Sequence, residues 1–270
     1  MISAGNIPVR RSTHGSMAPA CLRTNPNWVS CDQTLPNVLR VLSFNIQVGI
    51  NTQRYHHYLT RSWQHFLPHS RRQATLGQIA GMLNDFDLVA LQEVDGGSIR
   101  SGYVNQVEHL AKEGQFPYWY QQLNRNLGRL AQHSNGLLSR LPISHLEEHS
   151  LPGTLPGRGA IHARFGEGEH ALHVFVTHLA LGARIQHRQL QYLGELIAPL
   201  KHVIVMGDLN CTLVQLRQHK AFSEALDPPC AYGSMDAVTK PRRASSRAIL
   251  DNASFERWNP GTTMMNGAGD

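Results

Sequence analysis

Short apolar runs and stretches with helical spacing follow one another along the chain, and they predict its secondary structure. Four runs are rich in Val, Leu, Ile and Phe and are predicted to be buried strands: Val38–Ile46, Asp87–Glu93, Glu169–His178 and Val203–Met206. Further strands are predicted at Pro117–Gln122, Gly136–Ser139, Ile143–His149 and Ala160–Phe165. The polar stretch Asn124–Asn135 is predicted to be a loop.

Three other stretches place apolar residues three and four positions apart, as on one face of a helix. They are Gln73–Phe86, Val104–Ala111 and Gln186–Ile197. Leu213–Leu226 is predicted to be helix and loop, and Ile249–Phe255 is weakly helical. Strands and helices alternate irregularly between residues 38 and 226, with several strand–strand junctions. This pattern favours one domain with mixed sheets and helices outside them.

Composition and charge narrow the class of protein. The chain has 270 residues, 41% of them hydrophobic, 16% charged, and a net charge of +6, which fits a globular protein with an anionic partner or merely a basic surface. Its four cysteines form no Cys-x-x-Cys pair, so we expect reduced thiols and a cytoplasmic location. No signal peptide or membrane-spanning run is visible, and Met1–Asn37 is rich in Pro, Ser and Thr and is expected to be mostly disordered.

The stretch Lys201–Cys211 contains the clearest candidate chemistry. Gly207 is expected to end its apolar strand, and Asp208 and Asn210 follow, two positions apart. On an extended backbone both side chains would point the same way, where a carboxylate can hold Mg²⁺ or align a water and an amide can steady a phosphate oxygen. An Asx turn that only closes the strand is the alternative.

Polar residues also end three other apolar strands. These are Asn45, Glu93 and His178. Each alone has a structural explanation, but polar groups at the ends of several strands meet on one rim if the strands share a sheet. We therefore treat these residues, with Asp208 and Asn210, as one candidate site.

Five motifs, in this order and spacing, resemble those of the endonuclease/exonuclease/phosphatase superfamily. They are Leu42-Ser43-Phe44-Asn45, Leu91-Gln92-Glu93, Asn135-Gly136-Leu137-Leu138-Ser139-Arg140, Val176-Thr177-His178-Leu179 and Gly207-Asp208-Leu209-Asn210. The resemblance covers about residues 38 to 226. It implies an α+β fold: a four-layer α/β/β/α sandwich of two mixed β-sheets flanked by helices, with the site at one rim.

The resemblance also implies roles for the candidate residues. Glu93 matches the family's metal carboxylate for Mg²⁺ or Mn²⁺, and Asn45 matches a residue that supports the metal or phosphate. Asp208 matches the carboxylate that positions or deprotonates the attacking water, Asn210 a donor to a phosphate oxygen, and His178 a phosphate contact or general acid. Asn135 and Arg158 lie where the family lines its substrate cleft.

The carboxyl-terminal part departs from the family pattern. The family closes with a Ser-Asp-His motif whose Asp and His enter the active site, but no His follows His219 here. Pro241-Arg242-Arg243-Ala244 resembles the run before that motif, and Asp251-Asn252 is the nearest substitute for its Asp-His pair. A frameshift, a truncated gene or a diverged tail would explain the loss, which would leave a sheet edge unpaired.

We accordingly expect a disordered segment at 1–37, the family domain at 38–244 and a diverged or truncated tail at 245–270. The expected activity is hydrolysis of a phosphodiester or phosphomonoester by a monomer, without a membrane partner. A catalytically impaired relative that still binds metal or a phosphorylated ligand is the alternative, because a lost general acid or base removes about 10²- to 10⁴-fold in rate. Arg125, Arg129 and Tyr118-Trp119-Tyr120 could serve nucleic acid, but core packing explains the aromatic residues better.

Overall fold

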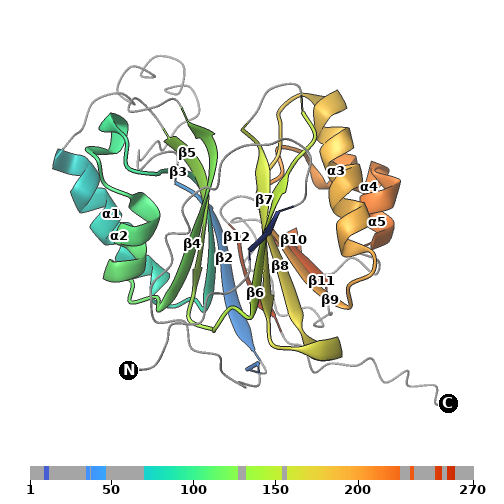
Figure 1. Ribbon diagram of the computed structural model, residues 1–270, viewed down its shortest axis with the longest axis horizontal. Coiled ribbons are helices and arrows are strands. Elements are labelled where there is room, and N and C mark those ends of the chain that lie inside the picture. The colour runs from blue at the N-terminus through green and yellow to red at the C-terminus, as the bar shows by residue number, and fades with distance from the viewer. Residues whose placement is uncertain are drawn as a thin grey trace.

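Two β-sheets pack face to face between two layers of helices (Figure 1). The coordinates are a computed structural model, and the structure describes residues 9–11, 35–36, 38–46, 70–126, 132–153, 157–225, 232–233, 247–250 and 254–258. Among these residues, no helix is both long and apolar enough to cross a membrane.

The larger sheet has seven strands in the order β1-β6-β7-β8-β9-β11-β10. Its β7–β8 pair is antiparallel and its β8–β9 pair parallel, so the sheet is mixed. Its strands are β1 (Val9–Arg11), β6 (His145–Ser150), β7 (Gly159–Phe165), β8 (Leu172–His178), β9 (His202–Asp208), β10 (Tyr232–Gly233) and β11 (Arg247–Leu250).

The smaller sheet has five strands in the order β12-β2-β3-β5-β4. It is mixed too, since β2 runs parallel to β3 while β5 is antiparallel to β3. Its strands are β2 (Leu39–Asn45), β3 (Leu88–Asp95), β4 (Tyr118–Asn126), β5 (Gln132–Ser139) and β12 (Ser254–Trp258).

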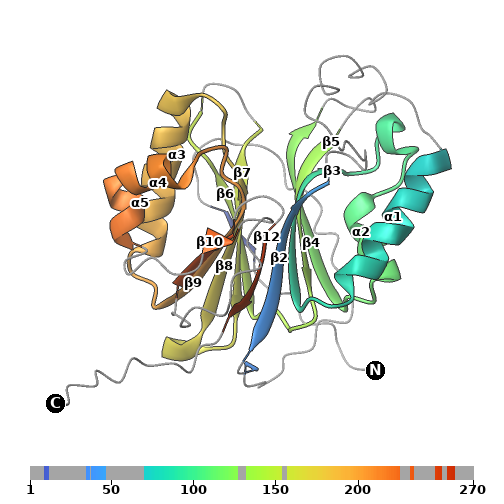
Figure 2. The same ribbon diagram turned by 180° about the vertical axis from the view of Figure 1, so that it is seen from behind.

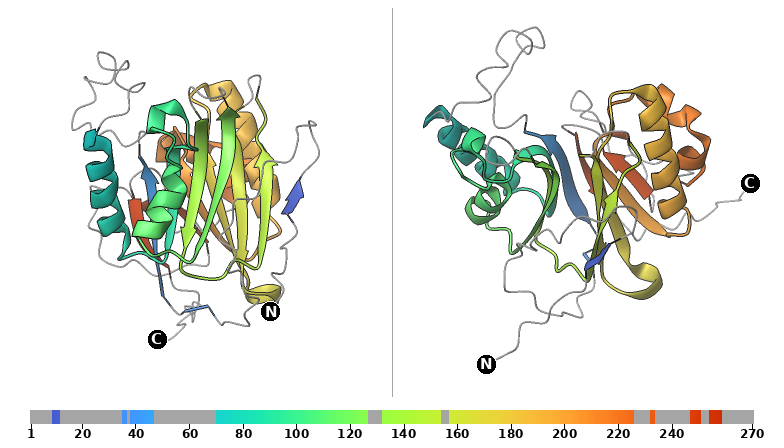
Figure 3. Two further views of the ribbon diagram at one scale, coloured as in Figure 1. Left: turned by 60° about the vertical axis from the view of Figure 1, so that its left-hand side comes forward. Right: turned by 45° about the horizontal axis from the view of Figure 1, so that its top comes forward.

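Helices cover the outer face of each sheet, as Figure 3 (right) shows from above. The smaller sheet carries α1 (Ser70–Leu83) and α2 (Gln106–Glu113), and the larger sheet carries α3 (Ala183–Ile197), α4 (Leu213–Gln218) and α5 (Lys220–Ala225). Short 3-10 turns lie at Ile99–Ser101 and Gly168–His170. The four-layer α/β/β/α sandwich predicted from the sequence is confirmed.

Three apolar clusters fill the spaces between these layers. One lies between the sheets and includes Leu88 and Ile204, another joins α1 and α2 to the smaller sheet, and the third joins α3 and α5 to the larger one. Trp119 and Tyr120 are buried in the first two of these clusters, so the aromatic trio serves packing. The loop predicted at Asn124–Asn135 is shorter than expected, because β4 and β5 pair as far as Asn126 and Gln132.

Both ends of the chain contribute strands that the sequence did not predict. Val9–Arg11, expected to be disordered, pairs in parallel with β6 at the edge of the larger sheet (Figure 3, left). The weakly helical patch predicted at Ile249–Phe255 is wrong. Arg247–Leu250 pairs with β9, and Ser254–Trp258 pairs with β2 (Figure 2).

The sandwich therefore continues past Ala244, where we expected the domain to end. The expected unpaired edge is also wrong, because β12 covers β2 and β11 covers β9. Main-chain hydrogen bonds do not depend on side-chain periodicity, so a short segment can join a sheet without a strong sequence pattern. Asp251 and Asn252 lie outside the described residues.

Candidate metal and phosphate site

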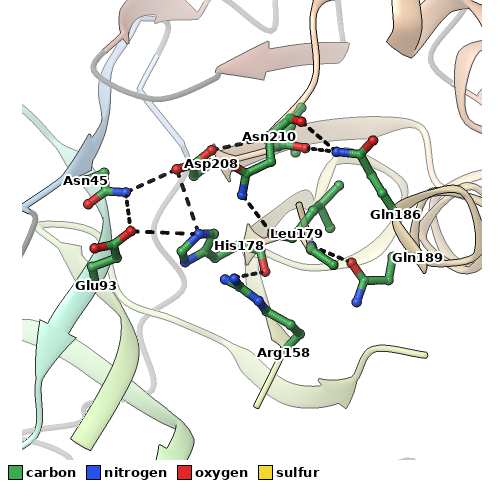
Figure 4. Close-up of polar contacts among 11 residues, drawn as sticks. Asn45, Glu93, Arg158, His178, Leu179, Gln186, Gln189, Asp208 and Asn210 are labelled. Carbon is green, nitrogen blue, oxygen red and sulfur yellow. Dashed lines mark hydrogen bonds and ion pairs between the residues drawn. The ribbon is translucent and has the colours of Figure 1, made fainter. Parts of the chain in front are cut away.

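Four of the predicted site residues leave the two sheets at one edge of the sandwich. Asn45 is the last residue of β2 in the smaller sheet, while His178 and Asp208 are the last residues of β8 and β9 in the larger one. His178 and Asp208 are register partners across the parallel β8–β9 pair, so they leave that sheet together. Figure 4 shows Asn45 and Glu93 facing them from the other sheet.

Glu93 reaches the site through a bulge rather than from a strand end. The β3–β5 register shifts between Leu91 and Val94, and Glu93 has a φ of 59°. A β-bulge re-aims a side chain that regular pleating would send elsewhere. The sequence identified Glu93 as the polar residue but placed it at the end of its strand, because an irregularity in pairing leaves no mark in hydrophobic alternation.

Asn45 links the two carboxylates. Its Nδ2 donates to Glu93 Oε1 at 3.0 Å and to Asp208 Oδ2 at 3.1 Å (Figure 4). The amide nitrogen thus lies between two oxygens that come from different sheets. In this arrangement Asn45 positions Glu93 and Asp208 by donating hydrogen bonds.

The sequence left open whether Asp208 faces a site or only closes its strand in an Asx turn, and in the structure it does both. Asp208 Oδ1 accepts from the Asn210 main-chain N–H at 3.1 Å, as in an Asx turn, while Oδ2 faces Asn45 and His178. Asn210 has a φ of 52° and donates from Nδ2 to the Leu179 carbonyl at 2.8 Å. The expectation that Asp208 and Asn210 project side by side from an extended backbone is therefore wrong.

Gly207 lies inside β9 and does not end the strand. It pairs with Thr177 and has a φ of 140°, a region that residues with a side chain avoid. A Cβ at this position would collide with the Thr177 carbonyl oxygen. The glycine lets β8 and β9 approach closely at the point where they deliver His178 and Asp208.

The His178 imidazole faces both carboxylates. Its Nε2 lies 4.0 Å from Glu93 Oε1 and 3.8 Å from Asp208 Oδ2. Burial, the Arg158 guanidinium and His133 lower the pKa of His178 to about 3. The ring is therefore neutral near pH 7, with one nitrogen that can donate and one that can accept.

Arg158 and Asn135 lie just behind this group. Arg158 donates from Nη1 to the His178 carbonyl at 3.5 Å; burial lowers the pKa of its guanidinium, and the charges of Glu93 and Asp208 oppose that shift. Asn135 donates from Nδ2 to the Gly159 carbonyl at 3.2 Å, so it joins the site through the start of β7. The structure thus brings Arg158 near both carboxylates. Asn135 contacts Gly159, the residue after Arg158, and not the carboxylates themselves.

Two glutamines of α3 hold the loops of the site and were missed at the sequence level. Gln186 donates from Nε2 to the Leu209 and Asn210 carbonyls, both at 2.8 Å. Gln189 accepts from the Ala180 N–H at 2.8 Å and donates to the Pro152 carbonyl at 3.0 Å. Their signal was available, since they lie three apart on the apolar face of the predicted helix, where a buried amide needs polar partners.

The donor set fits a divalent cation. Glu93, His178 and Asp208 each offer a ligand atom, and these atoms lie within 4.8 Å of one another. Carboxylate oxygens suit Mg²⁺ and Mn²⁺, and an imidazole nitrogen among them favours Mn²⁺ or another transition metal. His178 thus lies among the candidate ligands, in addition to the Glu93 expected from the sequence.

Two solved structures with TM-scores of 0.50 support the fold, and a third is similar over part of its length. An endonuclease/exonuclease/phosphatase family protein from Leptotrichia buccalis C-1013-b is 14% identical with a TM-score of 0.50, over 67% of this chain and 73% of that one. SmcL is 16% identical with a TM-score of 0.50, over 86% of each chain. The endonuclease/exonuclease/phosphatase from Beutenbergia cavernae DSM 12333 is 19% identical with a TM-score of 0.48, over 65% of this chain, which spans only 48% of that protein.

Sequence comparison gives the family directly. A search among curated proteins found no match. The family model described as the Endonuclease/Exonuclease/phosphatase family, however, matches residues 42–260, which include both carboxylates of the site and the late strands β11 and β12. The chain therefore belongs to the endonuclease/exonuclease/phosphatase family.

Proposed function

We propose that this protein is a divalent-metal-dependent hydrolase of phosphoric esters, with phosphodiesters, including nucleic acid, as the first substrates to test. The observation that carries the proposal is the meeting of two carboxylates and a neutral imidazole from two separate sheets. Family membership supports the same reaction class. The net charge of +6 suits an anionic substrate.

The proposed cofactor is Mg²⁺ or Mn²⁺, held by Glu93 and Asp208 with His178 as a further ligand. Both carboxylates are oriented before any ion binds, because Asn45 donates to each of them. When bound, the ion would supply positive charge to the phosphoryl oxygens.

Asp208 is the proposed group that orients the attacking water and accepts its proton. Its Oδ1 is held by the Asn210 N–H and its Oδ2 by Asn45, so the carboxylate cannot turn away from the site. A carboxylate fixed by two donors keeps a defined lone-pair direction for a water. This fixed orientation is what a general base needs in order to act at a single reacting position.

His178 and Arg158 are the proposed contacts to the phosphate. A neutral imidazole can donate one hydrogen bond to a phosphoryl oxygen without a proton being added first. The Arg158 guanidinium interacts electrostatically with Glu93 and Asp208. It therefore adds positive charge next to both carboxylates. Both groups would favour the charge that develops in the transition state.

The test measures hydrolysis of bis(p-nitrophenyl) phosphate and of plasmid DNA, with Mg²⁺, with Mn²⁺ and with EDTA. We expect metal-dependent turnover that falls by at least about 10²-fold in Glu93→Ala. Glu113→Ala is the matched control, since Glu113 is an exposed glutamate at the end of α2. Turnover that persists in EDTA, or that is equal in the two variants, would contradict the proposal.

A second candidate function is binding without efficient turnover. It is favoured by Asp251-Asn252, which follow the Pro241–Ala244 run where the family pattern has an Asp-His pair. Under this reading the protein binds Mn²⁺ in calorimetry, loses that binding in Glu93→Ala, and shows no hydrolysis of either substrate. Rapid hydrolysis by the wild-type chain would eliminate this second candidate.

A further inference from the structure

A second group of ligand side chains lies on the outer face of the larger sheet. The group, here called the histidine cluster, consists of Glu147, His149, His162 and His173. Glu147 is paired with His162 across β6 and β7, and His162 is in turn paired with Phe175 on β8. The neighbours Leu146 and Ile161 belong to the core between the sheets, so the cluster projects away from that core, toward α3.

Three ligand atoms of this cluster lie close to the spacing of a metal site. One ligand atom each from Glu147, His149 and His162 lies within 4.8 Å of the others. His149 Nε2 is 3.9 Å from Glu147 Oε2, which is too long for a hydrogen bond. Two ligands on one tetrahedral zinc ion are separated by about 3.3 Å, given bonds of about 2 Å, so a small approach would complete the geometry.

His149 presents a buried nitrogen that makes no hydrogen bond to any of the described residues. The side chain is only 3% exposed, and its Nε2 makes no hydrogen bond within the described part of the chain. Its other nitrogen, Nδ1, is held at 3.2 Å by the hydroxyl of Tyr192 on α3. An unsatisfied buried polar atom costs about 1–3 kcal/mol, and a ligating histidine is usually held by its second nitrogen in just this way.

His162 is oriented as firmly as His149. Its Nε2 lies 2.9 Å from His173 Nδ1, and its ring stacks on Phe175 with centroids 4.2 Å apart. The His162 ring is thus fixed both by a hydrogen bond and by stacking before any ion binds.

We propose that Glu147, His149 and His162 bind one divalent transition-metal ion, with Zn²⁺ as the expected ion. Two imidazoles and one carboxylate are typical zinc ligands, whereas Mg²⁺ prefers oxygen alone. The site shares no residue with the Glu93–His178–Asp208 group. Because Tyr192 holds His149, the ion would tie β6 and β7 to α3 and stabilise that side of the sandwich.

The experiment titrates Zn²⁺ into the tag-free full-length protein by calorimetry, in excess Mg²⁺. The parent protein carries Glu93→Gln, so that the first site contributes little. We expect the protein to bind Zn²⁺, with a dissociation constant that rises at least about tenfold in both His162→Gln and Glu147→Gln. His187→Gln is the control: it removes a histidine from the exposed pair formed by His187 on α3 and His219 just after α4, and it should leave Zn²⁺ binding unchanged.

Thermal unfolding gives an independent readout. Zn²⁺ should raise the melting temperature of the parent in a concentration-dependent way, and the increase should disappear in Glu147→Gln, whose partly exposed side chain leaves the core intact. A Zn²⁺ event of equal affinity in the parent, Glu147→Gln and His162→Gln would overturn the proposal. So would the absence of any Zn²⁺ event, or its loss in His187→Gln alone.

Discussion

At the scale of single residues, the candidate site depends on unusual backbone conformations. Glu93 and Asn210 have φ values of 59° and 52°, and Gly207 has a φ of 140°. Non-glycine residues in such regions cost about 1–3 kcal/mol each and persist only where the surroundings hold them. Here Asn45 holds the Glu93 carboxylate, and the Leu179 carbonyl holds the Asn210 amide. The strained backbone conformations direct the side chains of Glu93 and Asn210 to these contacts.

Gly207→Ala should destabilise the protein. The new Cβ would meet the Thr177 carbonyl oxygen, and alanine disfavours a φ of 140°. We expect a loss of at least about 1–3 kcal/mol in the free energy of unfolding, measured by denaturant titration. Gly81→Ala is the control: a Cβ there meets nothing within 4 Å, and alanine in a helix should add about 0.5–1 kcal/mol. Equal effects of the two substitutions would contradict this account of Gly207.

Asp208→Asn should lower kcat for phosphodiester hydrolysis by about 10²- to 10⁴-fold, because an amide cannot accept the proton of the attacking water. The amide oxygen can still accept from the Asn210 N–H, but the amide nitrogen cannot accept from Asn45, so the protein should stay folded with a modestly lower melting temperature. The exposed Asp85→Asn is the control variant and should keep wild-type kcat. A kcat within twofold of wild type in Asp208→Asn would show that another group is the base.

At the scale of elements, the loop after β3 is built around one buried carboxylate. Asp95 Oδ1 accepts from the Gly97 N–H at 2.9 Å and from the Ser98 N–H at 2.7 Å, and its Oδ2 accepts from the Ser98 hydroxyl at 2.6 Å. Burial raises the pKa of Asp95, but the hydrogen bonds from Ser98, Gly97 and Ser101 outweigh burial and lower it overall. The charged carboxylate thus organises the turn that follows the bulge at Glu93.

Asp95→Asn should cost about 1–3 kcal/mol of unfolding free energy at pH 7, because an amide accepts fewer of these hydrogen bonds. A carboxyl with a lowered pKa stabilises the fold above its ordinary pKa of about 3.9 and loses that contribution as the pH falls through the lowered value. The difference from wild type should therefore shrink when unfolding is measured at progressively lower pH. Asp85→Asn again serves as control, and a pH-independent difference would refute the assignment.

At the scale of the whole molecule, the chain returns to both sheets after α5. β11 pairs with β9, the strand that ends in Asp208, and β12 pairs with β2, the strand that ends in Asn45. These two late strands therefore support β9 and β2, the strands that carry Asp208 and Asn45 to the site from the two sheets. Without them, β2 and β9 would become exposed edges.

Truncation after Ala244 should therefore abolish the cooperative thermal unfolding transition or lower its midpoint by more than 10 °C, roughly as expected when several kcal/mol are lost. Truncation after Trp258 is the matched control, because it keeps β11 and β12, and it should unfold like the full-length chain. If the protein cut at Ala244 unfolds like the full-length chain, the late strands contribute little to stability.

The sequence anticipated much of the fold because apolar periodicity reports burial, which decides where strands and helices form. Val38–Ile46 and Gln186–Ile197 illustrate this, since they correspond closely to β2 and α3. The strands at 9–11 and 247–250 were missed, because a short strand is stabilised by main-chain pairing with a partner far away in the chain. For the same reason the bulge at Glu93 left no trace in the sequence.

The sequence alone identified the polar residues that end several apolar strands, because hydrophobic spacing reveals those strands, and its resemblance to the family implied the layers of the sandwich. Only the tertiary structure decided that Asn45 bridges Glu93 and Asp208, and that Glu147 meets His149 and His162 on a second face. Such meetings depend on register and bulges between strands that are distant in the chain. A one-dimensional pattern cannot specify them, because it records which residues are buried but not which residues they face.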